Sequence, residues 1–180
     1  KTELCQVSQI KTRGTDGYDA VQVCYGEEKV ENINKATRGH LKKVGDKGFK
    51  YFGEFHVSLP EEFKLGQVVK LDTFSVGEKV RVTGKSIVKD YKGNQKRHNF
   101  SRGPMTHGSK NHRLPGSIGA GSTPGRVYPG KKMAGQMGGA TVTLKNTEVL
   151  YINSEENILV LKGSVPGKKN TMLKIQSQKY

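Results

Sequence analysis

The stretch Tyr91–Thr147, YKGNQKRHNFSRGPMTHGSKNHRLPGSIGAGSTPGRVYPGKKMAGQMGGATVTLKNT, decides how the rest of the chain is organised. Its 57 residues include ten Lys or Arg and no Asp or Glu, and the nearest carboxylates are Asp90 and Glu148. It carries +10 of the formal charge of +15, which leaves +5 for the other 123 residues. Gly and Pro are frequent from 93 to 139 and large apolar residues are few, so this basic stretch cannot bury a core of its own.

The composition of the basic stretch favours a polyanion as its ligand. Like charges would hold the segment open, and Arg, Lys, Asn, Ser and backbone N–H groups together suit nucleic acid. A free, solvated loop is the alternative, because charge runs are often solvated. Glycines and prolines are spaced as turn markers, as in Leu114-Pro115-Gly116 and Thr123-Pro124-Gly125, which indicates a defined path. A defined path without a core needs a surface outside the protein, so nucleic acid is the favoured ligand.

Length and composition limit the remaining choices. The chain has 180 residues, 33% of them hydrophobic, and a pI near 9.8, which points to nucleic acid or an anionic membrane surface. No apolar run approaches the roughly 18 residues of a membrane span, so a membrane is not expected. Cys5 and Cys24 lack metal-ligand spacing and are expected to be reduced and partly buried. There is no initiating Met, signal peptide or transit peptide, so we expect a processed or trimmed chain.

Short strands are predicted on both sides of the basic stretch. Residues 18–25 alternate in polarity and predict a half-buried strand. Val21, Val23 and Tyr25 lie on one face, and Ala20, Gln22 and Cys24 lie on the other. Other strand signals cover 4–11, 67–71, 79–83, 141–144, 147–153, 157–162 and 171–176, and a loop of hairpin length, 153–157, joins two of them. Such a series predicts a mainly β protein, a small closed barrel or a sandwich.

Residues 27–66 predict a small α+β insert. Asn34 can cap a short helix over 35–44, Gly45 can end it, and Phe49, Tyr51 and Phe55 supply apolar contacts. The basic stretch leaves the strands near Asp90 and returns at Thr141, so it is an excursion from the β domain. Long loops without secondary structure are usually functional.

Two apparent motifs do not support a catalytic reading. Gly84-Lys85-Ser86 lacks the earlier glycine that a phosphate-binding loop needs, because Lys79 occupies that position. His98, His107 and His112 have no carboxylate or Cys nearby to orient them, and histidines among arginines more often contact phosphate or stack on bases. A ribonuclease that uses His98 and His112 remains an alternative, as does an RNA chaperone.

Several segments of the sequence strongly resemble the ribosomal protein L3 family in its bacterial and plastid form. They are Lys96 to Arg113, Pro115 to Gly119, Thr123 to Val127 and Gly130 to Gly138 in the basic stretch, with Asp16 to Gln22, Gly39 to Lys43 and Val165 to Gly167 outside it. The resemblance covers nearly the whole chain, in the family's order. Two departures stand out: the family's opening Gly-Met-Thr-like segment is absent, and Val88-Lys89-Asp90-Tyr91 replaces the usual Gly-Lys-Gly-Phe.

The resemblance implies a six-stranded translation-protein barrel with an inserted module and a long rRNA-penetrating loop. On this reading residues 1–26, 67–90 and 140–180 form the barrel, with its N-terminal strands missing, 27–66 the insert and 91–139 the extended loop. The implied function is structural: the protein binds large-subunit (23S-type) rRNA, helps to nucleate subunit assembly and extends a loop towards the peptidyl transferase centre. No enzymatic activity is expected.

Charge and family resemblance together select the candidate RNA-binding residues. Arg forks can bridge phosphates, whereas Lys acts as a point charge. The candidates are Lys92, Lys96, Arg97, His98, Asn99, Arg102, His107, Lys110, Asn111, His112, Arg113, Arg126, Lys131 and Lys132. Phe100 and Tyr128 could stack on bases or pack against the barrel. Near the peptidyl transferase centre the resemblance puts Gly135, Gln136, Met137 and Gly138, with Gln136 matching a glutamine that is methylated in many relatives.

The expected partners are large-subunit rRNA and neighbouring ribosomal proteins, with no membrane and no homo-oligomer. No cofactor or metal is expected, apart from Mg²⁺ or K⁺ held by the rRNA. The forms of residues 95–100 and 119–121 favour the chloroplast stroma, with the bacterial cytoplasm as the alternative.

Overall fold

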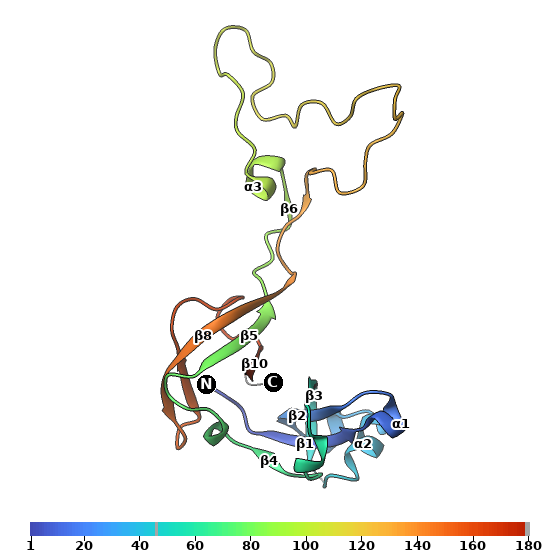
Figure 1. The fold of residues 1–180 in the computed structure, drawn as a ribbon, viewed down its shortest axis with the longest axis vertical. Helices are drawn as coiled ribbons and strands as arrows, with labels where there is room; N and C mark the ends of the chain where they lie inside the picture. Colours follow the sequence, from blue (N-terminus) through green and yellow to red (C-terminus); the bar gives the residue numbers. More distant parts are fainter. Residues whose placement is uncertain (46, 179–180) are drawn as a thin grey trace. The chain divides into compact units, whose positions relative to one another are not determined.

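The computed structural model describes residues 1–45 and 47–178, and it is mainly β (Figure 1). The strands are β1 Cys5–Lys11, β2 Ala20–Glu28, β3 Gly48–His56, β4 Val68–Val69, β5 Lys79–Lys85, β6 Tyr91–Lys92, β7 Gly135–Gln136, β8 Thr141–Asn153, β9 Ile158–Leu161 and β10 Leu173–Ser177. The helices are α1 Arg13–Asp16, α2 Lys35–Leu41 and α3 Asn94–His98, with 3₁₀ turns at Val30–Asn32, Pro60–Glu62 and Leu71–Thr73.

The described strands form two four-stranded sheets, in the orders β3-β2-β1-β4 and β10-β5-β8-β9, and a β6-β7 pair. Each four-stranded sheet ends in two edge strands, so no closed barrel is found among the described residues. The mainly β prediction is confirmed, and the closed barrel stays a prediction. The domain division also stays a prediction. The first sheet takes its strands from all three of the ranges 1–26, 27–66 and 67–90.

The chain divides into two compact units. Unit 1 comprises Lys1–Arg81, Lys145–Ser164 and Ile175–Tyr180, and unit 2 comprises Val82–Leu144 and Val165–Lys174. Strands β5, β8 and β10 each run on from one unit into the other.

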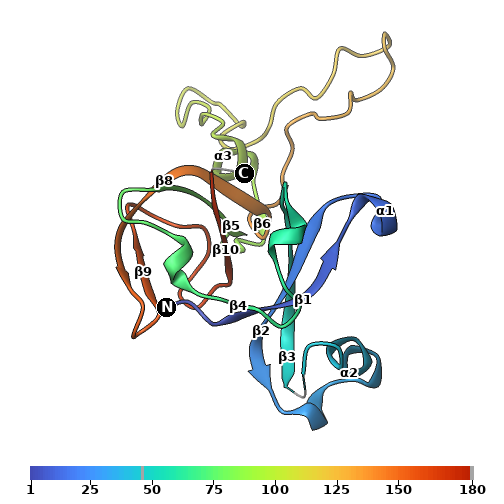
Figure 2. The same ribbon diagram turned by 60° about the horizontal axis from the view of Figure 1, so that its bottom comes forward.

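The alternation in β2 predicts a half-buried strand, but the first sheet of unit 1 carries apolar clusters on both faces. Val21 and Val23 join Val7 in one buried cluster, and Cys24 joins Leu41 and Phe49 in the other. Successive side chains of a strand point to opposite faces, so β2 serves both clusters. Figure 2 shows β1, β2 and β3 side by side, with α2 near one end of β3.

The sequence pattern does not predict β3. Residues 49, 51 and 55 were expected only to supply apolar contacts to the insert, yet Gly48–His56 pairs with β2 from Ala20↔His56 to Glu28↔Gly48. Helix α2 agrees better, because the Asn34 side chain accepts the Thr37 N–H at 2.7 Å. The helix ends at Leu41, before Gly45, and the buried Leu41 packs on Cys24 and Phe49.

Strand β8 is longer than predicted, whereas β9 and β10 are slightly shorter. The signals at 141–144 and 147–153 belong to one strand, β8, and β9 pairs antiparallel to its end with Asn153↔Ile158. The Asn153 side chain accepts the N–H groups of Glu155 and Glu156, and Asn157 has a positive φ, so the predicted hairpin loop is confirmed. The signal at 67–71 yields only the two-residue β4.

Both cysteines are free, and burial raises their pKa values above the ordinary thiol value. The pKa of the fully buried Cys24 reaches about 11, so this thiol is protonated and unreactive near neutral pH. None of the helices in the described part of the chain has the length and hydropathy of a membrane span.

Candidate nucleic-acid interface

The basic stretch begins with a folded stem in unit 2. Strands β6 and β7 pair antiparallel, with Tyr91↔Gln136 and Lys92↔Gly135 in register. The pairing continues towards β5 and β8: Lys89 N–H donates to Met137 O at 2.8 Å, Met137 N–H to Asp90 O at 3.0 Å, and Ser86 N–H to Ala140 O at 2.9 Å. Residues 86–92 and 135–140 therefore form one hydrogen-bonded ribbon.

Helix α3 braces this stem through side chains. The Arg97 guanidinium (Nη1) and the His98 ring (Nε2) both donate to Met133 O, at 2.6 and 3.0 Å. Asn94 is buried and donates to Lys132 O at 3.1 Å. The helix ends at Asn99, whose positive φ is tolerated by Asn. The two chain segments that enter and leave the extension are thus tied together at 94–98 and 132–136.

Glycine is required in the stem because the chains pass so closely. A methyl group on Gly138 would overlap the carbonyl of Ile87, and φ there is +80°. A methyl on Gly135 would lie 3.0 Å from Nη1 of Arg97. The segment Gly135–Gly138 is therefore part of the stem, and residues 93–134 lie beyond it.

Beyond the stem, residues 99–134 contain no helix or strand and form the long loop of Figure 1. The loop has sparse internal contacts. Gly103 N–H donates to His112 O at 3.0 Å, and the His112 ring donates to Pro104 O at 2.9 Å. The Arg126 guanidinium lies 5.4 Å from the centre of the Tyr128 ring. A cation stacked on an aromatic face remains able to contact phosphate with its edge.

Most of the candidate RNA-binding side chains are exposed. They are Lys96, Asn99, Arg102, His107, Lys110, Asn111, Arg113, Arg126, Lys131 and Lys132, and Gln136 is exposed as well. Four other candidates are half-buried: Lys92, Arg97, His98 and His112. The side chains of Arg97, His98 and His112 are hydrogen-bonded to backbone carbonyls. Arg97 and His98 therefore have a structural role that their charge does not indicate. Asn94, which donates to the neighbouring Lys132 O, is a stem residue that the sequence analysis missed.

The histidines are not gathered into a catalytic or metal site. His98 and His112 have separate carbonyl partners, and no group of three or more His, Cys, Asp or Glu in residues 1–45 and 47–178 could hold a metal ion. Phe100 is half-buried with its ring 6.3 Å from that of His98, and Tyr128 is 58% exposed. Tyr128 is thus accessible to a ligand, although Arg126 lies over its ring.

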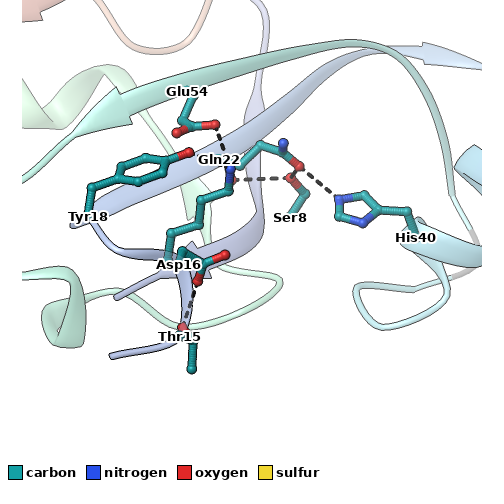
Figure 3. Close-up of polar contacts among 8 residues, drawn as sticks. Ser8, Thr15, Asp16, Tyr18, Gln22, His40 and Glu54 are labelled. Carbon is teal, nitrogen blue, oxygen red and sulfur yellow. Dashed lines mark hydrogen bonds and ion pairs between the residues drawn. The ribbon is translucent and has the colours of Figure 1, made fainter. Parts of the chain in front are cut away.

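The first sheet of unit 1 carries a separate cluster of hydrogen-bonded polar and titratable side chains (Figure 3). Lys11 Nζ donates to Tyr18 Oη at 2.7 Å and to Glu54 at 3.0 Å. The hydrogen bond to Tyr18 and then that to Glu54 raise the pKa of Lys11. Hydrogen bonding of Glu54 with Tyr18 and then with Lys11 lowers the pKa of Glu54. Ser8 and His40 both contact Gln22 Oε1, at 2.9 and 2.8 Å. Internal pairing of this kind fits a role in holding β1, β2, β3 and α2 together.

A mainly β scaffold with a long extension that is rich in cations and free of acids is the pattern expected of a nucleic-acid-binding protein. Comparison with known proteins identifies the family. The family model described as ribosomal protein L3 matches residues 55–158. The chain is 63% identical to the large ribosomal subunit protein uL3c of Emiliania huxleyi, over 99% of this chain and 86% of the relative. It is 53% identical to uL3c of Phaeodactylum tricornutum and 53% identical to uL3 of a Nostoc species, over 97% and 95% of this chain and 84% and 81% of those relatives.

The chain belongs to the ribosomal protein L3 family. The resemblance of the motifs in and around the basic stretch is therefore confirmed. Members of this family are structural components of the ribosome, so the prediction that the chain is not an enzyme is confirmed as well. Plastid-type (uL3c) relatives from algae and uL3 relatives from cyanobacteria both match, in agreement with a chloroplast ribosome and a bacterial alternative.

Proposed function

We propose that the chain is a structural constituent of the large ribosomal subunit that binds large-subunit rRNA through the basic stretch. One observation carries the proposal: residues 99–134 bury no side chain, contain no acid and expose Arg102, Lys110, Arg113, Arg126, Lys131 and Lys132. Such a segment gains its ordering energy from neutralising phosphates, because it has no core to supply that energy. The names of its relatives, large ribosomal subunit proteins, support the same assignment.

The salt dependence of RNA binding tests the proposal. Each phosphate contact that is lost lowers the slope of log K against log salt by about one unit. Arg113→Ala should therefore reduce the slope by about one, whereas Lys35→Ala, an exposed lysine of α2 in unit 1, should not change it. Equal slopes for the wild-type protein and Arg113→Ala would remove Arg113 from the interface, and a negligible slope for the wild type would reject the proposal.

Sedimentation separates a ribosomal protein from an RNA chaperone. We expect the chain to stay with the large subunit through a high-salt wash, as a built-in constituent does, whereas a transient chaperone would be released. A ribonuclease would instead cleave structured RNA, and that activity would have to persist through purification and disappear in His98→Ala or His112→Ala.

The finer parts of the family resemblance belong to the same proposal. They are a closed translation-protein barrel, a part in nucleating subunit assembly, contacts to neighbouring ribosomal proteins, a monomeric state within the subunit, and a position of Gly135–Gly138 close to the peptidyl transferase centre. Support for this last position comes from the resemblance alone. Because the stem holds β7 by backbone hydrogen bonds, Gln136 is presented at a defined point with its amide exposed.

A further inference from the structure

The loop Val165–Lys174 belongs to unit 2 together with most of the basic stretch, although residues of unit 1 separate the two along the chain. The loop contributes three lysines and no acid. Unit 2 as a whole has fourteen Lys or Arg and a single acid, Asp90, which gives +13 of the chain's formal charge of +15. Unit 1 is left with +2. Most of the net positive charge thus belongs to unit 2, and the loop is part of that unit.

The loop is held against β5 at both ends. Gly84 of β5 lies so close that a methyl group there would come within 2.5 Å of Leu173 Cδ2 and 3.1 Å of Pro166 Cγ. Strand β10, which begins at Leu173, is the sheet neighbour of β5. The Val165-Pro166-Gly167 motif therefore fixes where the loop starts, and Leu173 fixes where it ends.

A closed turn lies between these anchors. Lys168 N–H donates to Thr171 Oγ1 at 3.0 Å, and Thr171 N–H donates back to Lys168 O at 3.1 Å. Gly167 and Asn170 have positive φ values of 101° and 65°, which Gly and Asn accept most readily. The backbone of this turn is closed on itself before any ligand binds, so less conformational entropy is lost on binding.

The turn presents the side chains of Lys168 and Lys169, both exposed, to solvent. The salt bridges Lys11–Glu54, Arg13–Asp19, Lys47–Glu27 and Lys162–Glu148 all lie in unit 1, and none of them involves Lys168 or Lys169. No acid occurs anywhere in Asn157–Tyr180. Two adjacent lysines on a closed turn, with no carboxylate in their own segment, are suited to bind an external anion.

We propose that Lys168 and Lys169 form a second RNA-binding site, which contacts backbone phosphates of folded large-subunit rRNA. The inference rests on the proposed rRNA binding by the basic stretch and adds a contact surface from a separate part of the chain. RNA is favoured over an acidic protein because the loop belongs to the same compact unit as the basic stretch, whose composition selects nucleic acid. Lysine acts here as a point charge, so the site reads phosphate positions and not base sequence.

A matched pair of double variants tests the site on the full chain. Lys168→Gln/Lys169→Gln and Lys42→Gln/Lys43→Gln each remove two adjacent exposed lysines, from unit 2 and from unit 1. Binding to large-subunit rRNA is measured over a range of salt concentrations. We expect the first variant to lower the slope of log K against log salt by between one and two units, at about 0.7 to 0.9 per contact, and the second to leave it unchanged. Lys168→Arg/Lys169→Arg should keep the wild-type slope.

A third variant, Arg102→Gln/Arg113→Gln, separates this inference from the proposed function. If it lowers the slope while Lys168→Gln/Lys169→Gln does not, the loop site is rejected and the proposed function stands. If neither variant changes the slope, the proposed function itself fails. If the loop variant binds RNA with the wild-type slope but leaves the subunit at lower salt, the lysines contact a protein and the RNA site is overturned. Circular dichroism melting of each variant establishes that it is folded.

Discussion

At the scale of single residues, Gly138 and Gly116 occupy similar backbone conformations in different surroundings. Their φ values are +80° and +78°, so a side chain at either position strains the backbone. A methyl on Gly138 would also overlap the Ile87 carbonyl, whereas a methyl on Gly116 would meet no atom within 4 Å. Gly138 is therefore required by close packing of two chains, and Gly116 only by its own φ.

We predict that Gly138→Ala opens the stem and that Gly116→Ala does not. Strain of this kind costs about 1–3 kcal/mol, which corresponds to roughly a 5- to 160-fold faster exchange of the amides that the stem protects. Hydrogen exchange of Lys89 N–H and Met137 N–H, which bond to Met137 O and Asp90 O, measures the opening. Equal exchange rates in the two variants would contradict the role assigned to Gly138.

At the scale of elements, α3 divides the cationic side chains of the basic stretch into two groups. The side chains of Arg97 and His98 donate hydrogen bonds to Met133 O. Arg102 and Arg113 lie beyond the stem, and their side chains are exposed. Charge alone cannot separate the groups, because both are basic residues among glycines. The difference arises from the return of residues 132–136 to the side of α3.

We predict that trypsin cleaves the isolated protein rapidly after Arg102 and Arg113 and slowly after Arg97. Proteases require a locally open backbone, and α3 and its contacts with 132–133 restrict that opening. Mass spectrometry of timed digests gives the order of cleavage, and the denatured chain, in which every site is open, provides the control. Early cleavage after Arg97 in the folded protein would argue against the stem.

At the scale of the whole molecule, the residues that carry the charge are separate from those that carry the core. No residue from 101 to 130 is buried, whereas Val7, Val80, Val82 and Val149 are fully buried in the β elements. Removing the loop should therefore cost the fold little, because hydrophobic burial is the main source of folding free energy.

We predict that replacing residues 101–130 by a short Gly/Ser linker changes the melting temperature by less than about 3 °C, a shift that corresponds to roughly 1 kcal/mol in a chain of this size. The same deletion removes Arg102, Lys110, Arg113 and Arg126, so the salt slope of RNA binding should fall by up to about 3 to 4 units. Thermal melting and binding titrations measure the two effects. A large drop in melting temperature would mean that the loop contributes to the fold.

The sequence by itself determined the mainly β class, the two faces of β2, the capped helix at Asn34, the hairpin at 153–157 and the family. Each of these depends on local information: the period-2 alternation of a strand, a side chain within three residues of its partner, or a contiguous motif. The net charge of the basic stretch is likewise a property of composition alone.

Only the tertiary structure decided that Gly48–His56 is a strand, that Arg97 and His98 hold the stem, and that Val165–Lys174 shares a unit with the basic stretch. Each of these depends on partners far away along the chain, such as Met133 for Arg97 or Leu173 for Gly84. The register of strand pairing and the packing of a loop on a strand are settled by the hydrogen bonds and close contacts of the folded chain. The sequence therefore does not reveal whether a basic side chain is exposed to solvent, bonded to a backbone carbonyl or available to bind an external phosphate.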